Sequence, residues 1–235
     1  MSVGGRSVSL HLAQQRSLLA DKPLVVFASG DGGWFGAAVG MFETIAAAGY
    51  PVAGVSSRSL LRGLRANNGS IASSHVREVY GRIIQAARSA LSVPDGAPVI
   101  LAGWSRGAAL SVIADAEQST TAISGVVAIG LSAEEDLNVD LDSDDETDAG
   151  ERTSGSIDNY RLVDRSAARV AVIQSTGDGY FGAKPARDRF GADSATRRFF
   201  QVSASNHRFG GGEAGFRQAL TRALNWVATG KSDLK

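Results

Sequence analysis

The sequence predicts an α/β fold, in which a mostly parallel, twisted sheet carries helices on both of its faces. Short apolar runs without polar alternation, typical of strands buried on both faces, recur along the chain. Amphipathic stretches of helical length separate these runs. Strands that alternate with helices form βαβ units, whose strands are parallel. At 235 residues, the chain fits a single domain over residues 1–235.

Seven strands are predicted. In the first, Ser7–Ala13, the side chains of Val8, Leu10 and Leu12 share one face and His11 faces water, which indicates a half-exposed, antiparallel edge strand. The other strands are predicted at Leu24–Ser29, Pro51–Val55, Val99–Ala102, Ile123–Leu131, Val170–Ser175 and Arg197–Val202.

The predicted helices follow from apolar residues at helical spacing. They span Ala37–Ala48, Ile71–Leu91, Ala108–Ala114 and Glu213–Val227. Between two of them, Ser56–Ser70 is predicted as a polar loop. Its arginines 58, 62 and 65 are either surface charge or phosphate contacts. Leucines interleave with these arginines, so the segment is also a candidate for contact with a lipid interface.

Composition excludes several functions. The formal net charge is +0, so no overall field recruits nucleic acid or a membrane surface. The chain has no cysteine, which excludes disulfides, thiolate metal sites and a cysteine nucleophile. No apolar run approaches the ~18 residues of a membrane span. No apolar signal-peptide region is visible in Met1–Ser17.

One segment breaks the pattern by its acidity. Residues 133–150 read AEEDLNVDLDSDDETDAG, which predicts an exposed insertion within the domain. The favoured interpretation is a solvated loop, and the alternative is a funnel for a cationic substrate. Asp140, Asp142, Asp144 and Glu151 match part of a calcium-loop spacing, but Asp145 replaces the required glycine. We therefore expect no metal.

A glycine-flanked serine lies where one buried strand stops and a helix starts. Val99–Leu110 reads VILAGWSRGAAL, so residues 103–107 match G-x-S-x-G. In a strand–turn–helix context this is the nucleophile elbow of α/β-hydrolases. Side chains at Gly103 or Gly107 would collide with neighbouring backbone. The pattern predicts Ser105 as a nucleophile, with the amide of Arg106 as an oxyanion donor.

A serine nucleophile needs a base, and the base needs a group that fixes its tautomer. Among the three histidines, His207 follows the last strand, so its loop is expected at the same edge of the sheet as the elbow. We predict His207 as the base, and His11 and His75 as structural residues.

The acid is expected after an earlier strand, in the chain order Ser, Asp, His. Asp178 lies in a glycine-flanked turn directly after the strand Val170–Ser175, which favours it. A plain turn aspartate is the alternative interpretation. Asp158 and Asp164 are weaker candidates, because neither directly follows a buried strand.

The loop after the early central strand should give the second oxyanion donor. Glycines let its backbone approach a bound carbonyl, so we predict Gly32 and Gly33 there. Asp31 would repel an oxyanion. We expect it to point away, either capping the next helix or binding a cationic group of the substrate. Asp31, Trp34 and Trp104 are the predicted substrate-binding residues.

Taken together, these stretches resemble the VirJ/AcvB family of bacterial α/β-hydrolases. The matching stretches are FASGDGGWFG (Phe27–Gly36), VILAGWSRGAAL (Val99–Leu110), QSTGDGYF (Gln174–Phe181) and SNHRFGGG (Ser205–Gly212). The resemblance implies a triad of Ser105, Asp178 and His207. It also implies a periplasmic location, a link to type IV secretion and virulence, and hydrolysis of aminoacylated phosphatidylglycerol, notably the lysyl ester. Arg106 departs from the aromatic or apolar residue expected there.

Two classes of function fit these observations. The first is a serine esterase without a cofactor, which acts on a phospholipid ester such as lysyl-phosphatidylglycerol or on generic small esters. The second is a non-catalytic accessory protein of type IV secretion on a hydrolase scaffold, since fold alone does not fix function. The expected partners are an ester substrate, a membrane surface touched peripherally and a secretion-system protein, with no nucleic acid.

Overall fold

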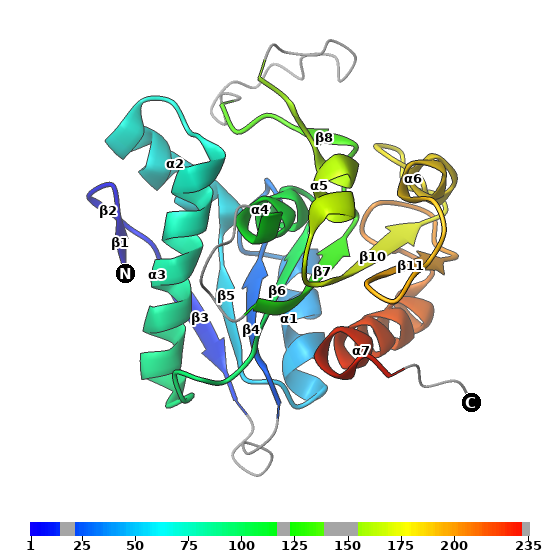
Figure 1. The fold of residues 1–235 in the computed structure, drawn as a ribbon, viewed down its shortest axis with the longest axis horizontal. Helices are drawn as coiled ribbons and strands as arrows, with labels where there is room; N and C mark the ends of the chain where they lie inside the picture. Colours follow the sequence, from blue (N-terminus) through cyan, green and yellow to red (C-terminus); the bar gives the residue numbers. More distant parts are fainter. Residues whose placement is uncertain (15–21, 117–122, 139–154, 232–235) are drawn as a thin grey trace.

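The central sheet determines the architecture of the protein. The computed structural model describes residues 1–14, 22–116, 123–138 and 155–231. Within these ranges seven strands form one sheet in the order β11-β10-β7-β6-β4-β5-β3 (Figure 1). They are β3 (Leu10–Ala13), β4 (Leu24–Ala28), β5 (Val52–Val55), β6 (Val99–Trp104), β7 (Ile123–Ile129), β10 (Arg169–Ser175) and β11 (Arg197–Val202). β3 is antiparallel to β5 and the other pairs are parallel, so the predicted sheet is confirmed.

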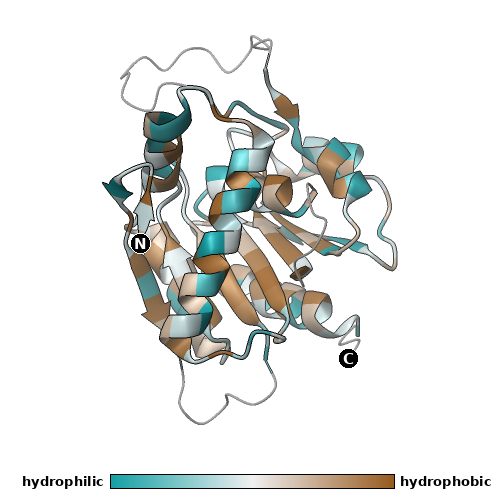
Figure 2. Cartoon of the chain, turned by 60° about the vertical axis from the view of Figure 1, so that its left-hand side comes forward, coloured by the Kyte–Doolittle hydropathy of each residue, from teal (hydrophilic) through white to brown (hydrophobic). Residues whose placement is uncertain are grey.

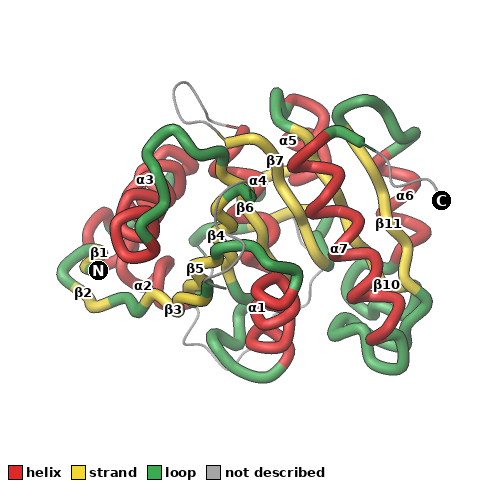
Figure 3. The backbone as a smooth tube through the Cα atoms, turned by 90° about the horizontal axis from the view of Figure 1, so that it is seen from below, coloured by secondary structure: helices red, strands yellow, loops and turns green. Residues whose placement is uncertain are grey.

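Helices cover both faces of the sheet (Figure 3). The helices are α1 (Ala37–Ala47), α2 (Ser57–Asn68), α3 (Ser73–Leu91), α4 (Arg106–Ala116), α5 (Asn159–Arg165), α6 (Ala183–Phe190) and α7 (Glu213–Thr229). Buried residues of α1 and α7 share one hydrophobic cluster, whereas those of α2, α3, α4, α5 and α6 share the other. Two short strand pairs complete the described elements: β1 (Ser2–Val3) with β2 (Arg6–Ser7), and β8 (Glu134–Glu135) with β9 (Ile157–Asp158).

The strands supply the centre of both cores. Along β4, Val25 and Phe27 belong to the cluster under α1 and α7, while Leu24, Val26 and Ala28 belong to the opposite one. All five side chains are buried, because a central parallel strand is covered on both faces. The strands are accordingly the most hydrophobic part of the ribbon (Figure 2). No helix in the described ranges is long and apolar enough to cross a bilayer.

The predicted orientation of the edge strand is confirmed at Val8, which is buried, and at Leu10, which packs against the same core, but it is wrong at Leu12 and His11. Leu12 is 43% exposed, whereas His11 is half-buried and stacks on Trp34 with ring centroids 4.1 Å apart. Successive side chains of the strand do alternate between its two faces, but the ring of Trp34 covers the face that carries His11. Burial also lowers the pKa of His11 below its usual value.

The segment predicted as the polar loop Ser56–Ser70 is instead the helix α2. Ser56 caps it, since its hydroxyl accepts from the amide of Ser59 at 3.3 Å. Its apolar residues Leu60, Leu61 and Leu64 are buried in the core. These leucines are therefore not exposed for the lipid contact considered from the sequence. The helices α5 and α6 were also not predicted.

The acidic segment lies only partly within the described residues. Residues 139–154, which include the calcium-loop positions and most of the proposed funnel, fall outside them. Of the described residues, Glu134 and Glu135 form β8, and Glu135 is 6% exposed. The prediction of an exposed acidic insertion is therefore wrong at Glu135.

Candidate active site

Ser105 lies on a strained turn between β6 and α4. Its backbone φ is 57°, in the left-handed region that side chains with a Cβ rarely adopt. A Cβ at Gly103 would lie 2.1 Å from the carbonyl oxygen of Gly107. A Cβ at Gly107 would lie 2.2 Å from that of Ala28. Both glycines of the elbow are thus required by backbone contacts, as predicted.

His207 and Asp178 are paired. His207 Nδ1 and Asp178 Oδ2 are 2.6 Å apart, and the aspartate side chain is 1% exposed. The other carboxylate oxygen, Oδ1, accepts from the amides of Tyr180 and Phe181 at 2.9 and 3.3 Å. Asp178 is therefore held in place, and it sets the tautomer of the imidazole with Nδ1 as the donor.

The pair lies against the elbow. The ring of Trp104, beside the serine, is 5.3 Å from that of His207, and its Nε1 donates to the carbonyl oxygen of His207 at 3.2 Å. A Cβ at Gly130 would lie 2.7 Å from His207 Cε1, so the glycine after β7 leaves space for the imidazole. His207 Nε2 is buried and makes no hydrogen bond within the described residues. A hydrogen bond between a catalytic base and the group that it deprotonates often forms only in the substrate complex.

Two loops that are distant in sequence hold this geometry. The amide of Gly177 and the hydroxyl of Thr176 donate to the carbonyl oxygen of Ala204 at 2.9 and 3.2 Å. A Cβ at Gly177 would lie 2.7 Å from the same oxygen. The loop that follows β10 and the loop that follows β11 are therefore joined directly, which fixes Asp178 relative to His207.

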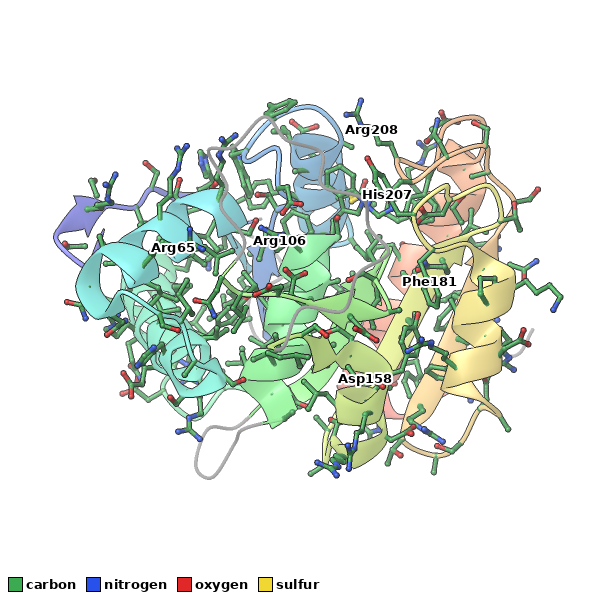
Figure 4. The ribbon with its side chains drawn as sticks, turned by 90° about the horizontal axis from the view of Figure 1, so that it is seen from above. Arg65, Arg106, Asp158, Phe181, His207 and Arg208 are labelled. Atoms are coloured by element: carbon green, nitrogen blue, oxygen red, sulfur yellow. The ribbon has the colours of Figure 1, made fainter. Side chains whose placement is uncertain are left out.

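The histidine loop is also braced from within. Asn206 Oδ1 accepts from the amides of Arg208 and Gly210 at 2.9 and 3.1 Å. Phe209, with φ 62°, is 1% exposed and packs on Phe216 with ring centroids 4.5 Å apart. The asparagine forms the turn and the phenylalanine anchors it on α7. Figure 4 labels His207 and Arg208 at this end of the molecule.

The loop after β4 approaches the serine at Gly30. A Cβ there would lie 3.2 Å from both Ser105 Cβ and the Trp104 ring. The amide of Gly33 donates to the carbonyl oxygen of Gly30 at 3.0 Å, so Gly33 closes a turn and its predicted role as an oxyanion donor is wrong. The amides of Asp31 and Gly32 make no backbone hydrogen bond within the described ranges. They are the candidate donors of this loop, beside the amide of Arg106.

Buried serine hydroxyls hold that loop. The carbonyl oxygen of Gly30 accepts from the hydroxyls of Ser29 and Ser57 at 3.1 and 3.0 Å, and both serines are fully buried. Ser57 is the first residue of α2. Neither serine is predicted as a support of this loop; Ser57 lies in the segment predicted as a loop, and Ser29 ends the predicted strand Leu24–Ser29.

Asp31 does not cap the next helix. The N-terminus of α1 has Gly36 at its cap and no side-chain cap. Asp31 Oδ1 instead lies 2.8 Å from Arg106 Nε, and Glu135 Oε1 lies 2.9 Å from the same nitrogen. Arg106, labelled in Figure 4, which departs from the residue type expected after the serine, is therefore the partner of Asp31.

The remaining predicted residues have assigned contacts. Trp34 stacks on His11 and meets Phe42 edge-on at 5.2 Å, and its ring occupies the space above Gly54, so it has a packing role in this structure. Its contact with substrate stays a prediction, as does that of Trp104. His75 Nδ1 accepts from the amide of Ala72 at 3.1 Å, which is a structural role.

The alternative acids are occupied elsewhere. Asp158 caps α5 by accepting from the amide of Arg161 at 3.0 Å, and Asp164 pairs with Arg197. Neither is the partner of His207. Among the residues that the structure describes, no group of three acidic or histidine side chains is placed to hold a metal ion.

A comparison with protein families identifies the chain. Residues 22–179, more than half of the sequence, match the family described as bacterial virulence protein (VirJ). The chain belongs to this family. The VirJ match includes the loop after β4, the elbow and Asp178. No curated protein sequence matches the chain.

Solved structures show the fold of this VirJ family member. It is similar to Est1E from Butyrivibrio proteoclasticus, with a TM-score of 0.63 and 13% identity over 97% of this chain and 98% of that one. It is also similar to a putative dienelactone hydrolase from Klebsiella pneumoniae, with a TM-score of 0.64 and 11% identity over 95% and 100%. Thermogutta terrifontis esterase 2 gives 0.64 and 14% over 97% and 91%. The fold is that of the α/β-hydrolases.

Proposed function

We propose that this protein is a serine esterase that uses Ser105, His207 and Asp178. The observation that carries the proposal is the buried pair of Asp178 and His207 beside the elbow, which leaves only Nε2 of the imidazole without a partner. The left-handed turn at Ser105 adds to it, because strained residues cluster at functional sites. The similarity in fold to esterases supports the same conclusion.

In the proposed reaction Ser105 Oγ attacks the ester carbonyl carbon while His207 Nε2 takes its proton. The imidazolium then gives that proton to the departing alcohol, and water releases the acyl group in the reverse sequence. Asp178 orients the imidazole and stabilises its charged form. The amides of Arg106 and of Asp31 or Gly32 stabilise the oxyanion, where each such donor contributes about 3–4 kcal/mol.

The proposed substrate is an aminoacyl-phospholipid ester of the lysyl-phosphatidylglycerol type. Membership of the VirJ family supports it, because the resemblance implies this substrate. The exposure of Asp31 agrees, since its side chain is 56% exposed in the loop after β4 (residues 30–34, the oxyanion loop). An aminoacyl ester carries its ammonium group one carbon from the reacting carbonyl, and the exposed part of the Asp31 carboxylate, whose Oδ1 also contacts Arg106, is the proposed partner of that ammonium.

Two exposed apolar side chains near the proposed site suit the lipid part of the substrate. Leu12, Phe35 and Tyr180 are the exposed large hydrophobic side chains in the described part of the chain. Phe35, which is 62% exposed, directly follows the oxyanion loop. Tyr180, which is 82% exposed, lies two residues after Asp178. The Tyr180 ring lies 5.2 Å from that of His207. Apolar side chains at the entrance of a site favour a substrate with hydrocarbon chains.

The variant Ser105→Ala tests the esterase assignment. We expect turnover of 4-nitrophenyl acetate to fall by on the order of a millionfold, because the nucleophile is lost while the oxyanion donors remain. A fluorophosphonate probe should label the wild-type protein and leave this variant unlabelled. Ser205→Ala, in the loop of the histidine, is the matched control and should still be labelled.

The same proteins test the substrate. Wild type should release lysine from lysyl-phosphatidylglycerol in mixed micelles, and Ser105→Ala should not. Cleavage of nitrophenyl esters without release of lysine would leave an esterase but exclude this substrate. A folded wild-type protein that neither reacts with the probe nor cleaves any ester would instead favour the accessory role. The periplasmic location and the secretion partner stay predictions, because they rest on the resemblance alone.

A further inference from the structure

Three ionisable side chains from three parts of the fold meet beside Ser105, the proposed nucleophile. Arg106 is the first residue of α4, Asp31 lies in the loop after β4, and Glu135 belongs to β8. Arg106 Nε is 2.8 Å from the aspartate and 2.9 Å from the glutamate. The side chain of Arg106 is 12% exposed and that of Glu135 is 6% exposed. A buried guanidinium that bridges two acids ties their segments together.

The charges in this cluster are balanced at neutral pH. Burial raises the pKa of Glu135 to about 8, although the neighbouring guanidinium of Arg106 opposes the shift and the nearby Asp31 and Asp136 add to it. Glu135 therefore retains its proton near neutrality and acts as a polar partner. Asp31 carries the negative charge that matches Arg106, so no net charge is left buried beside the oxyanion.

The two residues of this ion pair also belong to the two sides of the oxyanion hole. Arg106 contributes its own backbone amide, which at the first position of a helix has no partner within that helix. Asp31 lies in the loop that contributes the second amide. The distance between the two donors thus depends on whether the loop stays against the elbow, and the ion pair joins these segments directly.

We propose that Arg106 is a positioning residue: its guanidinium, held by Asp31 and Glu135, keeps the loop after β4 against the elbow so that both oxyanion donors face one point. This inference rests on the proposed esterase function. It also explains why Asp31 is tolerated, since its charge is matched by the arginine. Arginine suits this bridge because its side chain stays positively charged at every working pH, so its attraction to the Asp31 carboxylate persists.

The variant Arg106→Met tests the proposal, since it keeps the backbone amide and much of the side-chain volume. With 4-nitrophenyl acetate, a small neutral ester, we expect kcat to fall about 10- to 100-fold while KM changes less than about threefold, as for loss of an oxyanion donor. Arg106→Lys should recover part of kcat. Arg82→Met, at an exposed position of α3, is the control and should match wild type.

Asp31→Asn provides a second, independent variant, because this half-exposed residue is less important for folding. We expect kcat about three- to tenfold below wild type, and Asp31→Asn/Arg106→Met about as slow as Arg106→Met alone, because both changes break the same contact. Additive losses, or a wild-type kcat in either single variant, would overturn the positioning role. If those variants keep full kcat while Ser105→Ala is inactive, the esterase assignment stands without this inference. Activity in Ser105→Ala would reject the assignment itself.

Discussion

Glu135 is a carboxyl group whose protonation is coupled to folding. Its side chain is 6% exposed, and burial raises its pKa to about 8, well above the ordinary value of 4.5. Between these two pH values the folded protein keeps a proton on Glu135 that the unfolded chain releases. The stabilisation is therefore complete below about pH 4.5 and is lost as the pH rises through about 8.

The variant Glu135→Gln should remove this dependence. We expect it to resemble wild type at pH 5 and to be more stable at pH 9 by on the order of 2–4 kcal/mol, or about 5–10 °C in Tm. Thermal unfolding at the two pH values measures the difference. Glu43→Gln, at an exposed position of α1, is the control. A difference in Tm between Glu135→Gln and wild type that is the same at both pH values would contradict the prediction.

At the residue scale, the sequence predicts the side chains of the proposed catalytic triad better than the residues that support them. Ser105, Asp178 and His207 are predictable because each lies directly after a strand or at a fixed point of a motif. The contact between Arg106 and Asp31 is not predictable in this way. It depends on how two segments 75 positions apart meet in space, and a carboxylate beside an oxyanion looks unfavourable until its partner is known.

At the scale of elements, α2 links the core to the oxyanion loop. Its leucines are buried in the core, and its first residue, Ser57, donates to the carbonyl oxygen of Gly30 at 3.0 Å. Gly30 is the point of the loop that approaches Ser105. The helix therefore restrains the loop through a contact separate from the ion pair between Asp31 and Arg106.

Ser57→Ala should weaken this restraint. Loss of a buried hydrogen bond leaves the Gly30 carbonyl with fewer donors, so we expect a loss of about 1–2 kcal/mol in the free energy of unfolding. We also expect a several-fold lower kcat toward 4-nitrophenyl acetate. Urea unfolding and steady-state kinetics measure the two effects. Ser59→Ala in the same helix, where the backbone amide makes the contact with Ser56, should show neither.

The elements that the sequence did not predict are short or mixed in composition. α5 has 7 residues and α6 has 8, too few turns for a clear apolar period. α2 does carry leucines at helical spacing, but arginine, serine, asparagine and glycine dilute the pattern. In each case tertiary packing, which the local sequence does not encode, decides the structure. The long helices and the buried strands were predicted to within a few residues.

At the scale of the whole molecule, the sheet separates two hydrophobic cores. Ile83 of α3 lies in one of them and Leu220 of α7 lies in the other, and both are fully buried. The strands between them are continuous and covered on both faces. Side chains on opposite faces therefore share no direct contact, and each core should respond to substitution independently.

Ile83→Val and Leu220→Ala test this separation. We expect losses of about 0.5–1.5 and 2–4 kcal/mol, respectively, in the free energy of unfolding, from lost burial and the cavity left behind. In the double variant the losses should add to within about 0.5 kcal/mol. Urea unfolding of the four proteins gives the comparison. A coupling well above that margin would show that the sheet transmits strain between its faces.

The convergence of the active site is a property of the whole sheet that the sequence could predict. Parallel strands end at the same edge, so loops after β6, β10 and β11 must meet there. Which loop amides remain available is a finer property, and the prediction for Gly33 failed because a tight turn within the loop occupies its amide. The strand order thus determines which loops meet at the proposed active site, and the turn within a loop determines which of its amides are free to donate.

The left-handed backbone at Ser105 lowers the stability of the fold, while the serine side chain provides the proposed nucleophile. A residue with a Cβ in the left-handed region is disfavoured by about 1–2 kcal/mol, a cost that glycine would avoid. Glycine at position 105 would raise the free energy of unfolding, but glycine has no hydroxyl group that could act as a nucleophile. Every folded copy therefore retains a small conformational disadvantage at the residue that we propose as the nucleophile.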